Sequence, residues 1–434
     1  MRAATAHNRE QQVVEALERF NANLGEAFRQ QKYERMSVSA FSFFRGSNHL
    51  YWQDLYRDWH FSLFGGVTAT QTWLQGDAHL HNFGAYGSHD EQVRFGLDDF
   101  DDGIIGDYQY DLWRLLTSVV LAVRESESLK PEALSDILTT LIDSYLTTLQ
   151  QDTNTVADWA AMADTTDGRL QAFLIKLTEK KGRAGMLQKW TECAAGEERR
   201  FISDHPKLAP LSVVDRAALE QALVDYQATL NDQIPGHSRQ HFKVKDLARR
   251  LSAGTGSLGT DRYYALVEGQ GDGDHDDVIL DIKAQQPPAA WWVMNPAERA
   301  EYDQMFSHEG ERHALAFQAM ARHPDPYVGW LMLGDQVFSV RERSPFKADY
   351  PTDKLHKPKH WRHLATAWGR ILAASHLRGA RALSEGGADV FAEGVLQRTL
   401  PHAEAFTDLL LNMAQAYADC VQNDYQAFCR YRAC

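Results

Sequence analysis

The residues best suited to chemistry are concentrated in one stretch of the sequence, residues 75–115. In order, this stretch contains Asp77, His79, His81, Asn82, Asp98, Asp99, Asp101 and Asp102. So many carboxylates in a short segment repel one another unless a cation or a hydrogen-bond network holds them. A metal-dependent site is therefore the first hypothesis that this sequence suggests.

The loop at residues 76–82 fits a hydrolytic site in one interpretation. Read as Asp-x-His-x-His, it could end the first strand of a metal-dependent amidohydrolase barrel, with His79 and His81 as metal ligands. Such a barrel alternates strands and helices throughout, whereas residues 111–235 show only helical patterns. Acidic turns that cap helices are a further interpretation, but capping accounts for single aspartates and not for the whole set.

The same loop also has the parts of a phosphotransfer site. Asp77 is followed five residues later by Asn82, and a strand-like segment then leads to Asp99. Phosphotransfer sites combine a catalytic aspartate, a metal-binding asparagine and a metal-binding aspartate at the end of a strand. This interpretation assigns the catalytic role to Asp77 and metal binding to Asn82 and Asp99.

A glycine-rich loop later in the chain supplies a partner for such a site. The loop consists of Gly254, Thr255, Gly256, Ser257, Leu258 and Gly259. A dinucleotide-binding fold would need these glycines to open a helix, but a strand-like segment follows them, which favours a loop that closes over nucleotide phosphates. Lys283 lies in the next strand, where its ammonium could meet those phosphates. Taken alone, a lysine at the end of a strand is usually a solvated surface charge.

Helical segments flank these loops on both sides. Apolar residues recur at helical spacing in residues 8–31, 111–124, 131–232, 360–378 and 400–431. Residues 131–232 show no strand alternation, so we expect a helical insertion there that either shapes a substrate cleft or serves as scaffold. The pattern changes in residues 236–345, which predict five antiparallel strands, a helix at 296–322 and a hairpin around Gly334-Asp335.

Composition narrows the class of partner and compartment. The formal net charge of −14 argues against nucleic acid or an anionic membrane as a bulk partner. The four cysteines have neither zinc-ligand spacing nor the density of a disulfide scaffold, which favours a reducing compartment. The first residues lack an apolar signal segment, and no apolar run approaches membrane-spanning length. We therefore expect a cytoplasmic protein.

The order of these motifs resembles known families. The pattern Gly76-Asp77-x-His79-x-x-Asn82, followed by Asp99-Phe100-Asp101-Asp102 and Asp111-Leu112, is similar to the catalytic segment of aminoglycoside phosphotransferase-like kinases. Over residues 39–431 the chain also resembles the bacterial family called domain of unknown function 2252. That wider resemblance rests on Phe-Phe-Arg-Gly at 43–46, the GDAHLHNFG and DDFDD motifs, DLWRL, the glycine loop and a late Leu-Ala-x-x-His helix.

The resemblance implies an α+β, bilobal protein-kinase-like fold that is circularly permuted. In ordinary kinases the glycine loop and lysine precede the catalytic loop, whereas here they follow Asp77. Permutation is sterically permitted where the original termini lie close together at the surface. Residues 1–235 would begin a large helical lobe that includes an insertion at about 125–235, residues 236–345 would form the small nucleotide-binding lobe, and residues 346–434 would complete the large lobe. The C-terminal helices must then pack against the segment before Gln75.

The resemblance also implies cofactors and residue roles. ATP and Mg²⁺ would be bound, with Asn82 and Asp99 holding the magnesium and Asp101 as a further metal or water ligand. Asp77 would accept or orient the proton of the acceptor, and Lys283 would contact the phosphates. Backbone groups around Val340 to Arg343, a strand that includes Arg341, would meet the adenine.

Two further groups follow from the resemblance. Asp111 would hold the catalytic loop through its backbone amides. Kinases pair their lysine with a helix glutamate, and the candidates here are Glu298, Glu301, Glu309 and Glu311. Gln75 stands where related kinases often have histidine.

We therefore expect an ATP- and magnesium-dependent phosphotransferase that acts on an unknown small-molecule acceptor. Two alternatives stay open. The first is a catalytically inert or weak, pseudokinase-like nucleotide-binding module, which would bind ATP without transferring a phosphoryl group. The second is a metal-dependent amidohydrolase-like enzyme, which would carry a tightly bound transition metal such as zinc.

Overall fold

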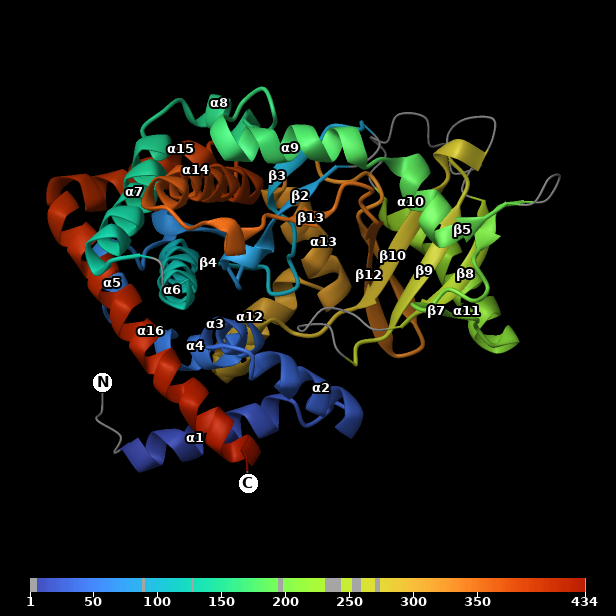
Figure 1. Cartoon of the computed structure of the whole chain (residues 1–434), viewed down its shortest axis with the longest axis horizontal. Helices are drawn as coiled ribbons and strands as arrows, with labels where there is room; N and C mark the ends of the chain where they lie inside the picture. Colours follow the sequence, from blue (N-terminus) through green and yellow to red (C-terminus); the bar gives the residue numbers. More distant parts are fainter. Residues whose placement is uncertain are drawn as a thin grey trace.

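The computed structural model of the chain describes residues 6–87, 90–126, 129–193, 198–230, 243–251, 259–269 and 274–433. Long helices and several antiparallel sheets are both present, which confirms the expected α+β class. Figure 1 shows most of the long helices gathered on the left and the largest sheet on the right. The described helices include none with the length and continuous apolar character needed to cross a bilayer.

The largest sheet has six antiparallel strands in the order β11-β12-β10-β9-β8-β7. Their bounds are Leu208–Ala209 (β7), Val244–Arg250 (β8), Arg262–Val267 (β9), Val278–Ala284 (β10), Gly329–Leu333 (β11) and Gln336–Glu342 (β12). Five of them match the strands that the sequence predicts, and the short β7 is an addition from the stretch expected to be helical. The hairpin prediction is confirmed, because Gly334 adopts a φ of 61° between β11 and β12.

Two helices cover opposite faces of this sheet, whose strands place apolar side chains alternately on each side. α11 (Val213–Tyr226) packs residues such as Leu223 onto one face. α10 (Arg183–Trp190) packs onto the other, where the ring of Trp190 lies 5.3 Å from that of Tyr264. Both helices come from the expected insertion, so this part of the insertion builds the sheet region and does not extend the helical region.

The helical region contains long helices drawn from both ends of the chain. They are α1 (Ala6–Phe20), α6 (Gln109–Glu125), α7 (Pro131–Leu149), α14 (Pro358–Leu383), α15 (Gly387–Thr399) and α16 (Ala403–Ala433). α14 lies directly against α7. The approach requires a glycine, because a Cβ at Gly369 would lie 2.4 Å from the carbonyl oxygen of Leu141.

Shorter helices complete the fold, and two predicted helices are each divided. They are α2 (Glu26–Met36), α3 (Ala40–Gly46), α4 (Asn48–Leu55), α5 (Phe61–Phe64), α8 (Thr153–Asp158), α9 (Gly168–Lys180), α12 (Pro296–Met305) and α13 (Glu309–Met320). The predicted opening helix breaks between α1 and α2, where Asn21 turns its side chain back onto the carbonyl of Leu17. The predicted helix at 296–322 breaks before His308, whose side chain caps α13.

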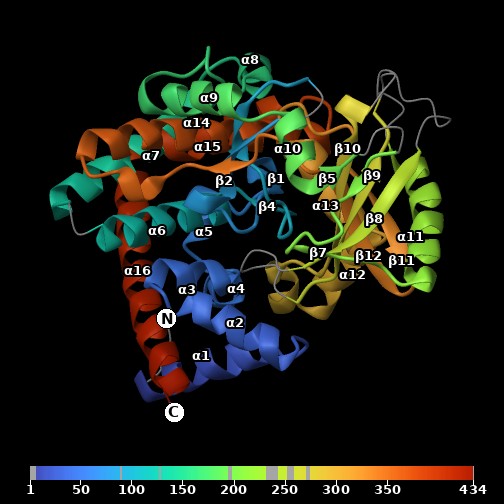
Figure 2. The ribbon, with the colours of Figure 1, turned by 45° about the vertical axis from the view of Figure 1, so that its right-hand side comes forward.

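The two ends of the chain pack together. α16 contacts α1, α3 and α6, and α14 contacts the strand that precedes Gln75. Arg9 of α1 bonds the carboxylates of Asp54 and Asp424, each at 2.6 Å, and so links α1, α4 and α16. Both views show α1 and the C-terminal part of α16 side by side below the rest of the helical region (Figures 1 and 2). This agrees with the prediction that the C-terminal helices pack against the segment before Gln75.

Two small sheets frame the loops of the acidic stretch. β1 (Gln71–Leu74) pairs with β4 (Ile104–Asp107), and β2 (Phe83–Tyr86) lies between β3 (Arg94–Leu97) and β13 (Ala348–Asp349). All of these pairs are antiparallel. The loops after β1 and after β3 therefore emerge at neighbouring positions. The two-residue strands β5 (Thr191–Glu192) and β6 (Arg200–Phe201) form a separate ribbon near the large sheet.

Candidate functional site

The loop that carries Asp77 is held by a buried carboxylate from α6. Asp111 accepts hydrogen bonds from the backbone N–H groups of Gln75, at 2.6 Å, and Gly76, at 2.9 Å. His376 of α14 lies on the same carboxylate, 3.2 Å from Oδ2, and its other ring nitrogen is 2.8 Å from the hydroxyl of Tyr145. This is the structural contact expected of Asp111, and it joins the loop to helices from both halves of the sequence.

Glycine is required at position 76 for two reasons. Gly76 adopts a φ of +78°, and a Cβ there would lie 1.9 Å from the backbone oxygen of Asp102. A side chain would therefore push apart the two acidic loops. The carbonyl of Gly76 accepts hydrogen bonds from Asn48 and from the indole of Trp52, both at 3.0 Å, which fixes the turn from the other side.

Asp77 is a largely buried carboxylate with two neighbours. Its Oδ1 accepts a hydrogen bond from Nε of Arg114 at 2.6 Å, and its Oδ2 lies 3.6 Å from Nε2 of His79. Burial raises the pKa of Asp77 to about 7, although the Arg114 guanidinium acts in the opposite direction. A carboxyl group with a pKa near 7 is matched to general-base catalysis at neutral pH.

His79 is held in one tautomer beside Asp77. Its Nδ1 accepts a hydrogen bond from the backbone N–H of His81 at 3.2 Å, so in the neutral ring the proton is on Nε2, which faces Asp77. Burial lowers the pKa of His79 well below its ordinary value, which keeps the ring neutral. A neutral His79 therefore faces Oδ2 of Asp77 at 3.6 Å through its Nε2–H.

The two histidines are not gathered into a metal centre. Nε2 of His81 lies 3.3 Å from the hydroxyl of Thr352. Across the described ranges, the only set of three histidine, cysteine or acidic ligand atoms within 4.8 Å of one another is Asp54, Cys420 and Asp424. Arg9 already bonds both carboxylates of that set, so its charge is balanced by a guanidinium.

The predicted metal ligands lie on the two loops next to Asp77. Nδ2 of Asn82 donates to the backbone oxygen of Asp77 at 3.1 Å, and Nε2 of Gln75 donates to the backbone oxygen of Asp99 at 2.6 Å. The backbone N–H of Asp98 also donates to the carbonyl of Asn82 at 3.2 Å. The structure thus ties the Asp77 loop to the aspartate segment after β3. An amide oxygen and a carboxylate are ligands that suit Mg²⁺.

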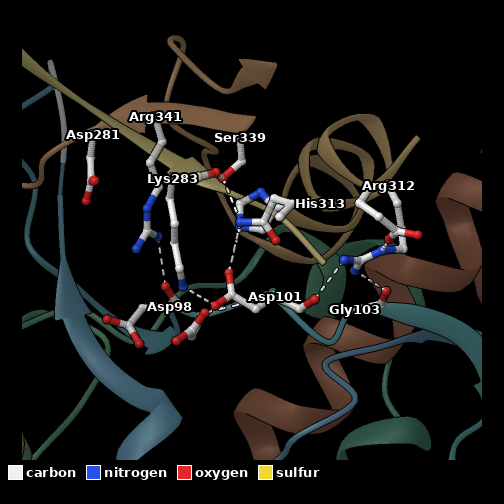
Figure 3. A network of polar contacts seen from close by, with 12 residues as sticks. Asp98, Asp101, Gly103, Asp281, Lys283, Arg312, His313, Ser339 and Arg341 are labelled. Atoms are coloured by element: carbon white, nitrogen blue, oxygen red, sulfur yellow. Dashed lines mark hydrogen bonds and ion pairs between the residues drawn. The ribbon is translucent and has the colours of Figure 1, made fainter. Parts of the chain in front are cut away.

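Lys283 reaches the acidic stretch from the large sheet (Figure 3). Its ammonium, at the end of β10, forms an ion pair with the carboxylate of Asp101. Gln285 donates to the same carboxylate at 3.2 Å, and Nε2 of His313 lies 3.7 Å from it. Burial would raise the pKa of Asp101, but the Lys283 ammonium outweighs it and holds this pKa below the ordinary value. Asp101 is therefore ionised and engaged on both oxygens.

The helix glutamate that the kinase resemblance leads us to expect is not beside Lys283. Glu298 pairs with Arg57, Glu309 contacts Arg312 at 2.6 Å, Glu311 accepts from the backbone of Ser307 at 2.8 Å, and Glu301 is exposed. α13 instead presents His313 to Asp101 and Arg312 to the acidic loop. The Arg312 guanidinium donates to the backbone oxygens of Asp101 and Gly103, each at 2.8 Å (Figure 3).

A cavity of about 310 Å³ lies between the large sheet and the acidic stretch. Its lining includes Asp98, Asp99, Asp101, Arg262, Asp281, Lys283, Ser339, Arg341 and Lys347. Within it, Arg262 bonds Asp281 at 2.6 Å, Arg341 donates to the backbone oxygen of Asp98 at 2.8 Å, and Lys347 lies 3.2 Å from the Asp98 carboxylate. The cavity is thus lined by both acidic and basic side chains.

Of the glycine-rich loop, the structure describes only the last residue, Gly259. Gly254, Thr255, Gly256 and Ser257 lie outside the described residues, so their assignment to nucleotide binding stays a prediction. Gly259 is described and adopts a φ of +77°, and a Cβ there would lie 3.1 Å from Leu24. The loop therefore ends against the segment that joins α1 to α2.

Sequence reasoning misses several groups of this site. Arg312 and His313 lie on a helix whose apolar pattern shows only that one side is buried, and no local motif distinguishes them. Arg114 lies within the DLWRL motif, but the motif by itself assigns no role to this arginine. Asp281 and Arg262 are also missed, because their meeting depends on the register of β9 against β10. A charged residue on the otherwise apolar face of a predicted buried helix is the signal that could have found Arg114.

Comparison with protein families identifies one match. A family model described as an uncharacterized protein conserved in bacteria (DUF2252) matches residues 26–431. No curated protein and no solved structure matches the chain. Because the matched residues span most of the sequence, the chain belongs to this DUF2252 family.

Proposed function

We propose that this member of the DUF2252 family is an ATP- and Mg²⁺-dependent phosphotransferase with a circularly permuted, kinase-like bilobal fold. Its acceptor would be a hydroxyl or amine of a small molecule. One observation carries the proposal: Lys283, from the sheet that follows the glycine loop, meets Asp101 across a cavity that Asp99 also lines. A lysine, an acidic metal-binding segment and a catalytic loop then share one site, as phosphoryl transfer needs.

In this proposal the chain's groups divide between the nucleotide and the acceptor. Asn82 and Asp99 would hold the magnesium, which when bound would neutralise charge on the phosphates. Lys283 and Arg262 project from the sheet toward the same cavity and would contact the phosphate oxygens. The strand from Val340 to Arg343 borders the cavity at Arg341, and its backbone would meet the base. Asp101, already bonded to Lys283, would orient that lysine rather than bind metal.

Asp77 would act on the acceptor. Its Oδ1 is fixed by Arg114, so Oδ2 is the oxygen available to take the acceptor's proton. The Nε2–H of His79 faces this oxygen and would keep it oriented. Removal of a positioned general base typically lowers a rate by about 10²- to 10⁴-fold.

The proposal is tested by pairing two substitutions in one set of binding and turnover measurements. Asp77→Ala should leave MgATP binding near the wild-type level and abolish phosphoryl transfer across a metabolite panel. Asp99→Ala should weaken MgATP binding, because the magnesium loses a ligand. Turnover by Asp77→Ala at the wild-type rate would refute the assigned mechanism.

A second function has one observation in its favour. Arg114 bonds Asp77 and is fully buried, so the guanidinium offsets the charge that a base would use. A catalytically inert nucleotide-binding module would tolerate this pairing. It predicts that MgATP binds but that neither hydrolysis nor transfer exceeds the rate of Asp77→Ala.

A further inference from the structure

Among the described residues, the guanidinium of Arg45 has no bonding partner, although it interacts electrostatically with the proposed catalytic Asp77. It belongs to α3, and its Nε is buried without a hydrogen-bond partner. Within the part of the chain that the structure describes, Arg45 forms neither a hydrogen bond nor an ion pair. Its guanidinium carbon lies 5.9 Å from the centroid of the Phe41 ring. Arg45 is half-buried, and its Nε is shielded from water without a partner, which an anion bound to the guanidinium would supply.

The surroundings of Arg45 are those of the catalytic loop. Phe41 also packs edge-on against the rings of His79 and His81, with centroids 6.3 and 5.0 Å away. His79 in turn faces Asp77. Arg45 interacts electrostatically with Asp77, Asp99 and Asp349 but is not bonded to any of them. Burial lowers the pKa of Arg45 from its ordinary value, yet the guanidinium stays charged at neutral pH.

Arg45 lies apart from the large cavity. The residues that line the cavity include Asp99 but not Asp77, His79, His81 or Arg45. Arg45 is therefore not part of the wall of this cavity. It interacts electrostatically with Asp77 and Asp99, so a group bound to it would be near the acidic stretch.

We infer that Arg45 binds an oxyanion, a carboxylate or a phosphate, at the reacting end of the site. A guanidinium presents two parallel N–H groups that match either anion. This inference rests on the proposed function, which supplies two sources for the anion: a charged group of the acceptor, or the terminal phosphate of the nucleotide. In both cases Arg45 holds the reactants together and does not itself exchange a proton.

The chain contains a matched control. Arg370 of α14 also has a buried Nε with no partner and also stacks on an aromatic ring, that of Trp159, at 4.0 Å. It lies in a separate surface hollow with His363 and Thr366. Arg45→Met and Arg370→Met therefore make the same chemical change in two places, and only the first is next to Asp77.

Inorganic phosphate is the probe in a thermal-unfolding titration of the full-length protein. We expect saturating phosphate to raise Tm by about 2 °C or more in the wild type and in Arg370→Met, and to leave Tm of Arg45→Met unchanged. The same rise should persist in Lys283→Gln. That substitution removes phosphate binding in the large cavity but leaves Arg45 in place. Without phosphate, Arg45→Met should unfold at or above the wild-type Tm, since an unpaired guanidinium is removed.

Three outcomes would overturn the inference. A phosphate-dependent rise that survives in Arg45→Met, or that vanishes in Lys283→Gln, would place the anion elsewhere. A Tm of Arg45→Met that falls more than that of Arg370→Met in the absence of phosphate would make Arg45 a structural residue.

Calorimetry with MgATP and MgADP separates the two sources. If the anion is the terminal phosphate, Arg45→Met should bind MgATP at least tenfold more weakly and MgADP as the wild type does. If the anion belongs to the acceptor, both affinities should be unchanged. A wild-type protein that binds neither nucleotide would refute the phosphotransferase proposal instead, and the phosphate titration would still decide the role of Arg45.

Discussion

Lys283 and Asp101 are 182 positions apart in the sequence and form an ion pair where the large sheet meets the acidic stretch. Gln285 and His313 contact the same carboxylate, so Asp101 is the point where β10, α13 and the loop after β3 converge. The lysine is therefore oriented by a residue of the proposed metal-binding segment. A substitution in that segment should therefore change the orientation of the Lys283 side chain.

Asp101→Asn tests this coupling. The amide keeps the shape of the side chain but removes the charge, and a hydrogen bond to a charged group contributes about 1.5–3 kcal/mol. We expect ATP turnover to fall about 10- to 100-fold as Lys283 loses its orientation. Glu301→Gln, at an exposed position of α12, is the control and should retain full turnover. An equal loss in both variants would argue against the coupling.

Asp77 should give the turnover rate a pH dependence near neutrality. Its pKa is raised to about 7, so the carboxyl is protonated at lower pH and cannot accept the acceptor's proton. We expect kcat/KM for ATP turnover to rise with pH and to level off above about 7. Arg114 lowers this pKa, so Arg114→Met should move the rise of kcat/KM to higher pH. A rise of kcat/KM at the pH where an ordinary carboxyl group titrates would contradict the assignment of Asp77 as the base.

Asp111→Asn should destabilise the fold. Asp111 is fully buried and accepts two backbone N–H groups while His376 lies on the same carboxylate, whereas an asparagine can offer only one acceptor oxygen. One buried N–H would be left unpaired, and we expect the free energy of unfolding to fall by about 3 kcal/mol. Urea denaturation measures it. Asp419→Asn, which removes an exposed ion pair with Arg124, should change it by less than about 1 kcal/mol.

Gly369→Ala should separate α14 from α7. The added methyl group would lie 2.4 Å from the carbonyl oxygen of Leu141, in a contact made by backbone that cannot yield easily. We expect a loss of about 1–3 kcal/mol or more in stability by urea denaturation. Gly185→Ala in α10 is the matched control: nothing lies within 4 Å of the new Cβ, so the substitution should stabilise by up to about 1 kcal/mol. Loss of stability in both variants would point to a general intolerance of alanine.

Much of the candidate site can be predicted from the short spacing of its residues along the sequence. Asp77, Asn82 and Asp99 are separated by one short loop and one hairpin, so their proximity follows from the sequence with little freedom. The β11-β12 hairpin follows from Gly334 for the same reason. The meeting of His376 with Asp111 is not predicted by the sequence analysis, because nothing local links positions so far apart.

Contacts that depend on packing register could not be predicted. The resemblance to kinases implies a glutamate from residues 296–322 as the partner of Lys283, yet α13 turns Arg312 and His313 inward. A rotation of that helix by one residue would change which side chain faces the loop, and the apolar pattern alone does not fix it to that accuracy. The break before His308, which sets the rotation, depends on a side-chain cap that sequence periodicity does not reveal.

The contact between His376 and Asp111 also fixes when the site can exist during synthesis. The Asp77 loop emerges from the ribosome well before the helix that carries His376. α16, which bonds Arg9 of α1 through Asp424, emerges later still. A nascent chain that stops before α14 therefore holds the acidic loop and Lys283 without the histidine that contacts Asp111.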